Sequence, residues 1–493
     1  MSNTQKSTLP SAAFADSKPH YALLDGLRGA AALMVVWYHF FEGFAFAEGS
    51  AITTFCHGHL GVDLFFMLSG FVISYAYDDR WNAQVNRLTL KEFFKRRLIR
   101  LHPMLVMGAV IGLVTFLLQG GVQWDGSPTP LSWSLVAVVL AMLFVPAYPG
   151  APYDLRGNGE MFSLNGPSWS LFFEYIGNLL YALFIRRLTN RALAVLATVL
   201  GALWAWFAIA DVSGYDMIGV GWTLDSVNFC GGMLRMLFPF TVGMLLARNF
   251  KPVKVKGIFW IAWAVLFGLF SVPAFAKCDT VSLNGLYEFG CVLIVFPAIV
   301  WLAASGETTG KMSARVCKFL GDISYPLYIV HYPIMYLFYA WLIENEHYSL
   351  GATWPVVLMV FGINITLAYT CLKLYDEPVR RCLSKRFLKK YETMKRIKIT
   401  VMRITRYEDL MAQYENPIEH ACDMRLGQTF IVENGERPAA MCESAWQTLQ
   451  PFVKELAEGG GNFFDGWMRN PHSAMLSCND GFRPVSFYVE VIE

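Results

Sequence analysis

Between residues 21 and 375, long apolar runs alternate with short polar segments. A helix needs about 20 mostly apolar residues to cross the roughly 30 Å hydrocarbon core of a bilayer. Eleven runs approach or reach that length, and they are residues 21–46, 59–78, 101–118, 131–147, 168–185, 192–210, 232–247, 257–275, 286–304, 321–343 and 353–375. The pattern therefore predicts an all-α polytopic membrane protein.

Basic residues between these runs set the predicted topology, because Lys and Arg collect in cytoplasmic loops. The clusters are residues 80–100, 186–191, 248–256, 311–318 and 380–398. If all eleven runs crossed the membrane, the cluster at 186–191 and every later one would lie outside. Leaving out the short run at 131–147 places all five clusters in the cytoplasm. We predict about ten crossings, both termini cytoplasmic, and 131–147 re-entrant or at the outer interface.

The composition changes after Tyr375 to a charged segment and then to a soluble one. Polar and apolar residues alternate in 395–404 and in 483–491, as they do in β-strands. In 445–457 the apolar residues have helical spacing, and this segment ends before three glycines. A small cytoplasmic α+β domain is therefore predicted. The predicted parts are a cytoplasmic N-terminal tail (1–20), a membrane domain (21–380), a basic linker (381–394) and the soluble domain (395–493).

Composition agrees with a membrane protein, because 55% of the 493 residues are hydrophobic and only 16% are charged. The formal net charge of +2 is too small to suggest a nucleic-acid partner. No cleavable signal peptide is expected, because the first twenty residues are polar and the first apolar run is long. The ten cysteines include no C-x-x-C pair, so we infer no disulfide framework.

Arg28 and His39 lie eleven positions apart in the first apolar run. At 100° per residue they share one helix face, about 16 Å apart along the axis. Ionisable groups at bilayer depth are costly, so by default they line a site or a pathway. Two structural alternatives stay open: Arg28 can pair with Asp25 one turn earlier, and a lone membrane histidine is often simply packed and hydrogen-bonded.

Six stretches occur in a definite order along the chain. They are Arg28 and His39 with ten residues between them, G-V-D-L-F-F-M-L-S-G-F at 61–71, R-R-L-I-R-L-H-P at 96–103, W-S-L-F-F-E-Y at 169–175, S-Y-P-L-Y-I-V-H at 324–331, and Glu377-Pro378 with Arg380. Together, over about residues 21–385, they resemble the membrane acyltransferase-3 family. That family moves an acyl group, often acetyl, from a coenzyme A thioester to a hydroxyl, commonly on a cell-envelope carbohydrate.

The resemblance implies an O-acyltransferase of the bacterial plasma membrane, with acyl-coenzyme A and a carbohydrate as substrates and no tightly bound cofactor or metal. His39 would transfer the proton, either as a base alone or also as a transient acyl carrier. Arg97 and Arg100, one helical step apart, suit the phosphates of coenzyme A, and Arg28 is a further donor-binding candidate. The alternative is that these arginines only obey the positive-inside rule or hold lipid phosphates.

Glu174 is the second catalytic candidate. An unpaired carboxylate in its apolar run would be costly, so it either partners a cation or binds the acceptor. Further candidates to line the substrate are Asp25, Asp63, Ser69, Ser324, Tyr328 and His331. Ser69 lacks the strand and helix of a nucleophile elbow, so Ser69-Gly70 favours close helix packing. The face shared by Ser324, Tyr328 and His331 suits either helix-to-helix hydrogen bonds or a site.

The C-terminal segment resembles a small uncharacterised bacterial domain family, through residues 397–401, 427–432, 442–446 and 478–485. The resemblance implies no activity. Cys422, Cys442 and Cys478 stand at that family's cysteine positions. They are either buried structural residues or part of a small-ligand or metal site, although their spacing matches no zinc module.

Two other functions stay open from the sequence. The same ionisable residues could form the proton relay of a membrane transporter without covalent chemistry. Many transporters are built from two similar halves, and the lack of such an internal repeat in this sequence counts against that alternative. The soluble domain could also sense a ligand and gate the enzyme, which is compatible with acyl transfer.

Overall fold

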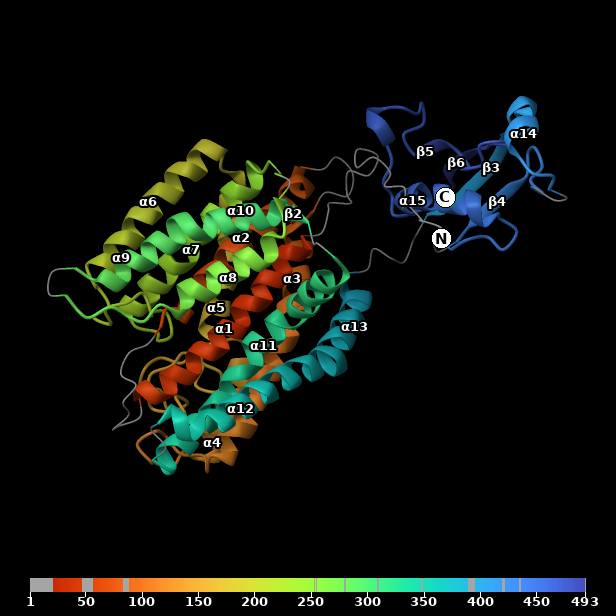
Figure 1. Cartoon of the computed structure of the whole chain (residues 1–493). Helices are drawn as coiled ribbons and strands as arrows, with labels where there is room; N and C mark the ends of the chain where they lie inside the picture. The colour runs from red at the N-terminus through yellow and green to blue at the C-terminus, as the bar shows by residue number, and fades with distance from the viewer. Residues whose placement is uncertain are drawn as a thin grey trace. The chain divides into compact units, whose positions relative to one another are not determined.

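The computed structural model describes residues 21–46, 56–82, 88–251, 253, 255–278, 281–307, 310–346, 349–388, 395–418, 422–433 and 436–492 (Figure 1). The chain divides into a helical unit and a smaller unit that contains the C-terminal residues from Lys385 onward. The predicted tail, residues 1–20, lies outside the described part, as does much of the predicted linker. An all-α membrane unit and an α+β domain are both confirmed.

The helical unit contains thirteen α-helices within the described residues. They are α1 (Ala22–Phe46), α2 (Gly61–Asn82), α3 (Leu90–Leu118), α4 (Leu131–Met142), α5 (Ser168–Leu183), α6 (Asn190–Ile209), α7 (Ser226–Arg248), α8 (Ile258–Ser271), α9 (Leu283–Gly290), α10 (Phe296–Ser305), α11 (Gly310–Glu344), α12 (Leu350–Cys371) and α13 (Glu377–Phe387). Short π-helical turns join α9 to α10 and α12 to α13. A two-residue parallel pair, β1 (Val255–Lys256) and β2 (Gly306–Glu307), forms a small sheet in this unit.

Seven helical segments of the described chain are long and apolar enough to cross a membrane. They are Gly58–Trp81, Leu90–Leu118, Asn190–Ile209, Ser226–Arg248, Leu283–Ser305, Gly310–Glu344 and Leu350–Phe387. Helix α1 lies outside these seven, although its 25 residues rise about 37 Å. Helix α4 has 12 residues and rises only about 18 Å, too short to cross and consistent with its predicted position. Helix α8 lies in a run that was predicted to cross the membrane, but it has only 14 residues. The number of crossings stays a prediction.

Helices α1 and α11 run side by side through the unit (Figure 1). Their close approach depends on Gly29, where a Cβ would lie 2.1 Å from the backbone oxygen of Leu320. Helix α11 contains Pro333, which has no N–H to give to the carbonyl of Ile329. The Asn165 side chain donates to that oxygen instead, at 2.9 Å. The long helix that borders the site is thus stabilised from outside.

The C-terminal unit is a four-stranded antiparallel sheet with helices. It comprises β3 (Arg396–Ile404), α14 (Glu408–Tyr414), β4 (Thr429–Val432), α15 (Glu443–Ala457), β5 (Ser473–Ser477) and β6 (Val485–Ile492), with strand order β4-β3-β6-β5. Alternate β3 side chains are buried against α15, whose Leu449 and Val453 are fully covered. The predicted strands at 395–404 and 483–491 and the predicted helix at 445–457 are confirmed. Strands β4 and β5 and helix α14 were not predicted.

Candidate active site

His39 lies in the last two turns of α1, and its partner is a residue that the sequence analysis missed. The Nδ1 atom of His39 lies 2.5 Å from Oε2 of Glu42, three residues later on the same helix face. Both side chains are about one-sixth exposed, at 15% and 16%. Among the described residues, Nε2 of His39 has no hydrogen-bond partner. An imidazole bonded at one nitrogen and accessible at the other can accept a proton.

Aromatic residues of α11 surround this pair. The hydroxyls of Tyr332 and Tyr339 donate to Oε2 of Glu42 at 3.2 and 3.1 Å. The His331 ring lies beside His39, with centroids 5.3 Å apart. His331 is fully buried, and its Nε2 has no partner among the described residues. Of the predicted residues of α11, His331 is therefore the one brought to His39.

At the other end of α1, Arg28 is tied to two neighbours. Its Nη2 lies 3.1 Å from the Asp25 carboxylate, and its Nε donates to the Ser324 hydroxyl at 2.9 Å. The ion pair expected as the structural alternative is therefore present. About a quarter of each of the two charged side chains is exposed. Ser324 joins helix α11 to α1, as helix-to-helix hydrogen bonding predicts.

Glu174 is an ion-pair partner. Its Oε1 lies 2.6 Å from Nη2 of Arg97 and accepts the Ser69 hydroxyl at 2.9 Å. Of the two alternatives for Glu174, the cation partner is the one observed, and no contact with His39 occurs in the described chain. Its catalytic role stays a prediction. Ser69 and Gly70 do mark close helix packing, because a Cβ at Gly70 would lie 2.0 Å from the oxygen of Phe240.

Arg97 and Arg100 differ although they are one helical step apart. Arg97 is 8% exposed and holds Glu174. Arg100 is exposed and has no ion pair or hydrogen bond within the described chain. It lies within electrostatic range of the cations Arg28, Arg97 and Arg380 and of the carboxylates of Asp25 and Asp376. The predicted donor-binding arginines thus form a basic cluster in which Arg28 and Arg97 are ion-paired and Arg100, within the described chain, is not. Donor binding by these arginines stays a prediction.

Asp63 lies in a sealed ion pair. Its two carboxylate oxygens accept Nη2 and Nε of Arg235 at 2.7 and 3.2 Å, and both side chains are at most 1% exposed. The Arg235 guanidinium also donates to the backbone oxygens of Val220 and His59. A fully covered carboxylate with two partners does not fit the predicted substrate-lining role. Asp63 is instead a structural centre that joins α2 to α7.

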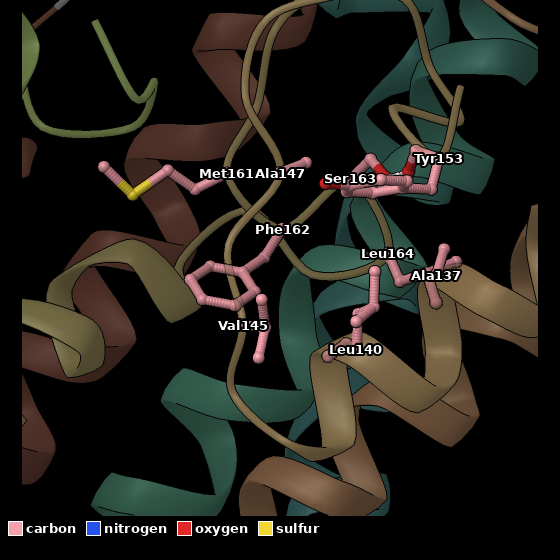
Figure 2. Close-up of a pocket in the computed structure, with 10 residues that line it drawn as sticks. Ala137, Leu140, Val145, Ala147, Tyr153, Met161, Phe162, Ser163 and Leu164 are labelled. Carbon is pink, nitrogen blue, oxygen red and sulfur yellow. Dashed lines mark hydrogen bonds between the residues drawn. The ribbon is translucent and has the colours of Figure 1, made fainter. Parts of the chain in front are cut away.

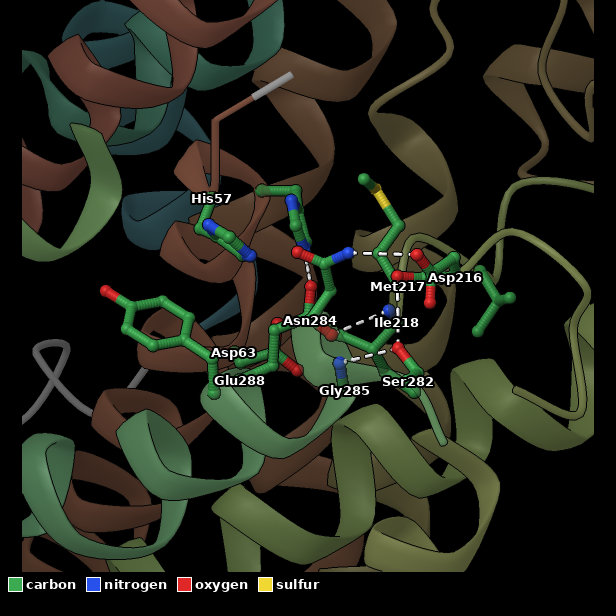
Figure 3. Close-up of polar contacts among 12 residues, drawn as sticks. His57, Asp63, Asp216, Met217, Ile218, Ser282, Asn284, Gly285 and Glu288 are labelled. Carbon is green, nitrogen blue, oxygen red and sulfur yellow. Dashed lines mark hydrogen bonds and ion pairs between the residues drawn. The ribbon is translucent and has the colours of Figure 1, made fainter. Parts of the chain in front are cut away.

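Next to that pair, the loop between α6 and α7, which contains Asp216 and Ile218, is fastened to α9 (Figure 3). Glu288 accepts the backbone N–H of Ile218 at 2.7 Å and contacts Nε2 of His59 at 2.8 Å. Asn284 donates to the carboxylate of Asp216 at 3.1 Å. Through α9, these contacts connect the loop to the turn that precedes α2. Tyr328, a further lining candidate, is likewise held by the Ser170 hydroxyl at 2.7 Å.

The segment between α4 and α5 folds around a buried arginine. Arg156 donates to the oxygens of Ser163 and Gln119 at 2.8 and 2.9 Å, and its guanidinium lies 3.4 Å from the Tyr336 ring centroid. The Tyr336 hydroxyl donates to the Glu160 carboxylate. Burial raises the pKa of that carboxyl from 4.5 to about 7. The segment therefore contains a carboxyl group that titrates near neutral pH.

We expect Glu160 to make the protein less stable as the pH rises. Its folded-state pKa is above its unfolded value, so the folded protein binds this proton more tightly. The resulting stability is fully present below about pH 4.5 and is lost as the pH rises through about 7. Glu160→Gln should flatten this part of the profile in thermal unfolding of detergent-solubilised protein. Glu344→Gln, at an exposed position at the end of α11, is the control. An unchanged slope in Glu160→Gln would contradict this assignment.

A small pocket lies between α4 and the segment that follows it (Figure 2). Its lining is mostly apolar, with side chains such as Leu140, Val145 and Phe162. None of the predicted site residues lines it. We therefore assign it no part in the chemistry.

The three cysteines of the C-terminal unit do not form a cluster. Cys422 and Cys442 are exposed and Cys478 is partly buried. The interpretation as buried structural residues is therefore wrong for the first two, because Cys442 precedes α15 at the surface. Within the described chain, no group of three or more His, Cys, Asp or Glu is placed to hold a metal ion. A small-ligand role stays a prediction.

Comparison with known proteins identifies the family of the chain. Residues 21–373 match the acyltransferase domain of the acyltransferase-3 family. Protein 2 in the picA locus of Rhizobium radiobacter is 36% identical over 193 residues, or 36% of this chain and 92% of that protein. Acyltransferase MdmB of Streptomyces mycarofaciens is 26% identical over 340 residues, which cover 63% of this chain and 78% of that protein. Peptidoglycan O-acetyltransferase OatA of Listeria monocytogenes is 27% identical over 342 residues, which cover 65% of this chain and 50% of that protein. No solved structure matches.

The family match covers more than two thirds of the chain and includes five of the six motifs in full. It favours an enzyme over the transporter alternative. The apolar helices agree with a membrane location. The chain therefore belongs to the acyltransferase-3 family and is a multi-pass membrane acyltransferase.

Proposed function

We propose that the protein transfers an acyl group, with acetyl as the expected one, from acyl-coenzyme A to a hydroxyl of a cell-envelope or exported carbohydrate. The observation that carries the proposal is the partly exposed imidazole of His39, bonded at Nδ1 and without a described partner at Nε2. A carbohydrate acceptor is supported by the relative from Listeria monocytogenes, which is named a peptidoglycan O-acetyltransferase. This chain covers half of that relative.

In the proposed reaction, Nε2 of His39 takes the proton of the acceptor hydroxyl. The hydroxyl oxygen attacks the thioester carbonyl carbon and forms the ester bond. The carbon–sulfur bond breaks, the electron pair leaves with sulfur, and the imidazolium returns its proton to the thiolate. Attack by His39 itself, with a transient acyl-imidazole, is the second route, and it yields the same products.

The basic cluster at the other end of α1 suits the donor. Arg100 is exposed and without a carboxylate partner in the described chain, and Arg28 is about one-quarter exposed. Guanidinium groups bind phosphate oxygens with charge-assisted hydrogen bonds. Arg28 and His39 are about 16 Å apart along the helix. The long pantetheine arm of coenzyme A is suited to such a separation. We place the Arg28 end at the cytoplasmic face of the plasma membrane, following the basic clusters.

Thioester turnover by purified protein tests the donor. We expect the protein in detergent to consume acetyl-coenzyme A when a peptidoglycan fragment is added and to release free coenzyme A in equal amount to ester. Longer acyl-coenzyme A thioesters should be assayed in parallel. Movement of the glycan across sealed vesicles without thioester loss would instead support the transporter alternative.

Arg100→Ala should raise the KM for acetyl-coenzyme A about tenfold, with little change in kcat. A hydrogen bond to a charged group contributes about 1.5–3 kcal/mol, and 1.4 kcal/mol corresponds to a factor of ten. Initial rates over a range of donor concentrations measure the change. Arg191→Ala, at an exposed arginine at the start of α6, is the matched control. An equal effect of both substitutions would indicate general charge loss and no specific contact.

A further inference from the structure

Glu42 contacts His39 but belongs to none of the six motifs. Its Oε2 lies 2.5 Å from Nδ1 of His39. An ionised carboxylate only accepts hydrogen bonds, so the proton in this contact belongs to Nδ1. The lone pair of the neutral imidazole then lies at Nε2. The contact thus decides which nitrogen of His39 is able to act as a base.

Glu42 is itself held in place from the neighbouring helix. Tyr332 and Tyr339 donate their hydroxyls to the same oxygen, Oε2, at 3.2 and 3.1 Å. The Tyr339 hydroxyl also lies 2.7 Å from the backbone oxygen of His39, so its proton is shared. Tyr339 comes this close because residue 43 is glycine, where a Cβ would lie 2.5 Å from the Tyr339 ring. The carboxylate is therefore fixed relative to both the imidazole and the backbone of α1.

The second imidazole of the site does not compete for this carboxylate. Nδ1 of His331 lies 3.1 and 2.9 Å from the backbone oxygens of Leu327 and Tyr328. Because carbonyl oxygens only accept, His331 has its proton at Nδ1 and uses it within its own helix. Among the described residues, His39 is the one imidazole hydrogen-bonded to Glu42.

We propose that Glu42 is a positioning residue that fixes the orientation and the tautomer of His39. The inference rests on the proposed function, since it names what prepares His39 for proton transfer. Glu42 keeps the proton on Nδ1, directs Nε2 toward the acceptor hydroxyl and stabilises the imidazolium that forms. Carboxylates orient catalytic histidines in this way on unrelated folds, and replacing one such Asp with Asn lowered kcat about 10⁴-fold in a serine protease.

The test compares four variants of the full-length protein in detergent. Glu42→Gln should lower kcat about 10²- to 10⁴-fold and leave the KM for acetyl-coenzyme A unchanged. Glu42→Asp keeps a carboxylate, so its kcat should be at least about tenfold higher than that of Glu42→Gln. Tyr339→Phe should lower kcat by less than Glu42→Gln, because Tyr332 still holds the carboxylate. Glu344→Gln, the exposed control on the same helix as the tyrosines, should match the unmodified protein.

Nitrogen NMR of isotope-labelled histidine gives a readout that does not require turnover. The His39 signal, assigned by its loss in His39→Gln, should report a proton on Nδ1 in the unmodified protein. In Glu42→Gln it should move toward the other tautomer or a mixture. This measurement separates the two proposals, because a protein without acyl transfer can still show the tautomer.

Two results would overturn the role of Glu42. One is an unchanged kcat and tautomer in Glu42→Gln, with acyl transfer intact in the unmodified protein. The other is an equal loss in Glu42→Gln and Glu42→Asp together with a raised KM, which would indicate a general structural role. If Glu42→Gln does not fold, Glu42→Asp and Tyr339→Phe decide between the same results, since both variants keep a carboxylate at position 42.

Discussion

Replacing His39 with alanine should lower acyl transfer by about 10²- to 10⁴-fold, the usual contribution of general acid–base catalysis. His39 is the imidazole whose Nε2 has no described partner and whose side chain is partly exposed. Its removal takes away the proton acceptor and leaves the hydroxyl a weak nucleophile near neutral pH. The substitution changes one side chain in the last two turns of α1, so the helix should still form. Consumption of acetyl-coenzyme A by purified protein measures the loss.

The control for this variant is His472→Ala, which changes a histidine of the C-terminal unit. Its rate should equal that of the unmodified protein. Both variants need the same yield in membranes and the same elution volume in detergent. A correctly folded His39→Ala protein that retains more than about a tenth of the rate would remove His39 from the mechanism.

Asp63→Ala should destabilise the protein by about 3–5 kcal/mol, the cost of leaving one partner of a buried ion pair uncompensated. The Arg235 guanidinium is 1% exposed and would lose both of its charged hydrogen bonds. The double variant Asp63→Leu with Arg235→Met should recover part of the loss, because it removes both charges. Thermal unfolding of each variant in detergent gives the comparison.

The matched control for Asp63 is Asp322→Ala, which breaks an exposed pair with Lys318. The side chains of that pair are 39% and 76% exposed, so its loss should cost at most about 1 kcal/mol. Comparable destabilisation by the two substitutions would contradict the view that Asp63 is a sealed structural centre.

The first helix was predictable because its information is local. Arg28 and His39 share a face by helical periodicity, and the alternative pair of Arg28 with Asp25 is one turn apart. The predicted strands at 395–404 and 483–491 likewise follow from alternation within each segment. Short elements such as β4, with four residues, contain too few positions for a period to be recognised.

Glu42 was missed because its importance depends on residues about 290 positions later in the chain. The one local signal was its spacing of three from His39. Arg97 and Arg100 were predicted together, yet residues three apart on a helix differ by about 60° in direction. A partner on one side, Glu174, therefore covers Arg97 and leaves Arg100 exposed. Periodicity gives the face of a helix, and the tertiary partner decides which residue of that face is free.

The most direct test of the central claim is the formation of the ester product from labelled acetyl-coenzyme A and a peptidoglycan fragment. Mass spectrometry should find the labelled acetyl group on a sugar hydroxyl with the unmodified protein and with His472→Ala, and at most about a hundredth of that amount with His39→Ala. Labelled ester in equal amount with all three proteins would contradict the claim that His39 performs the transfer.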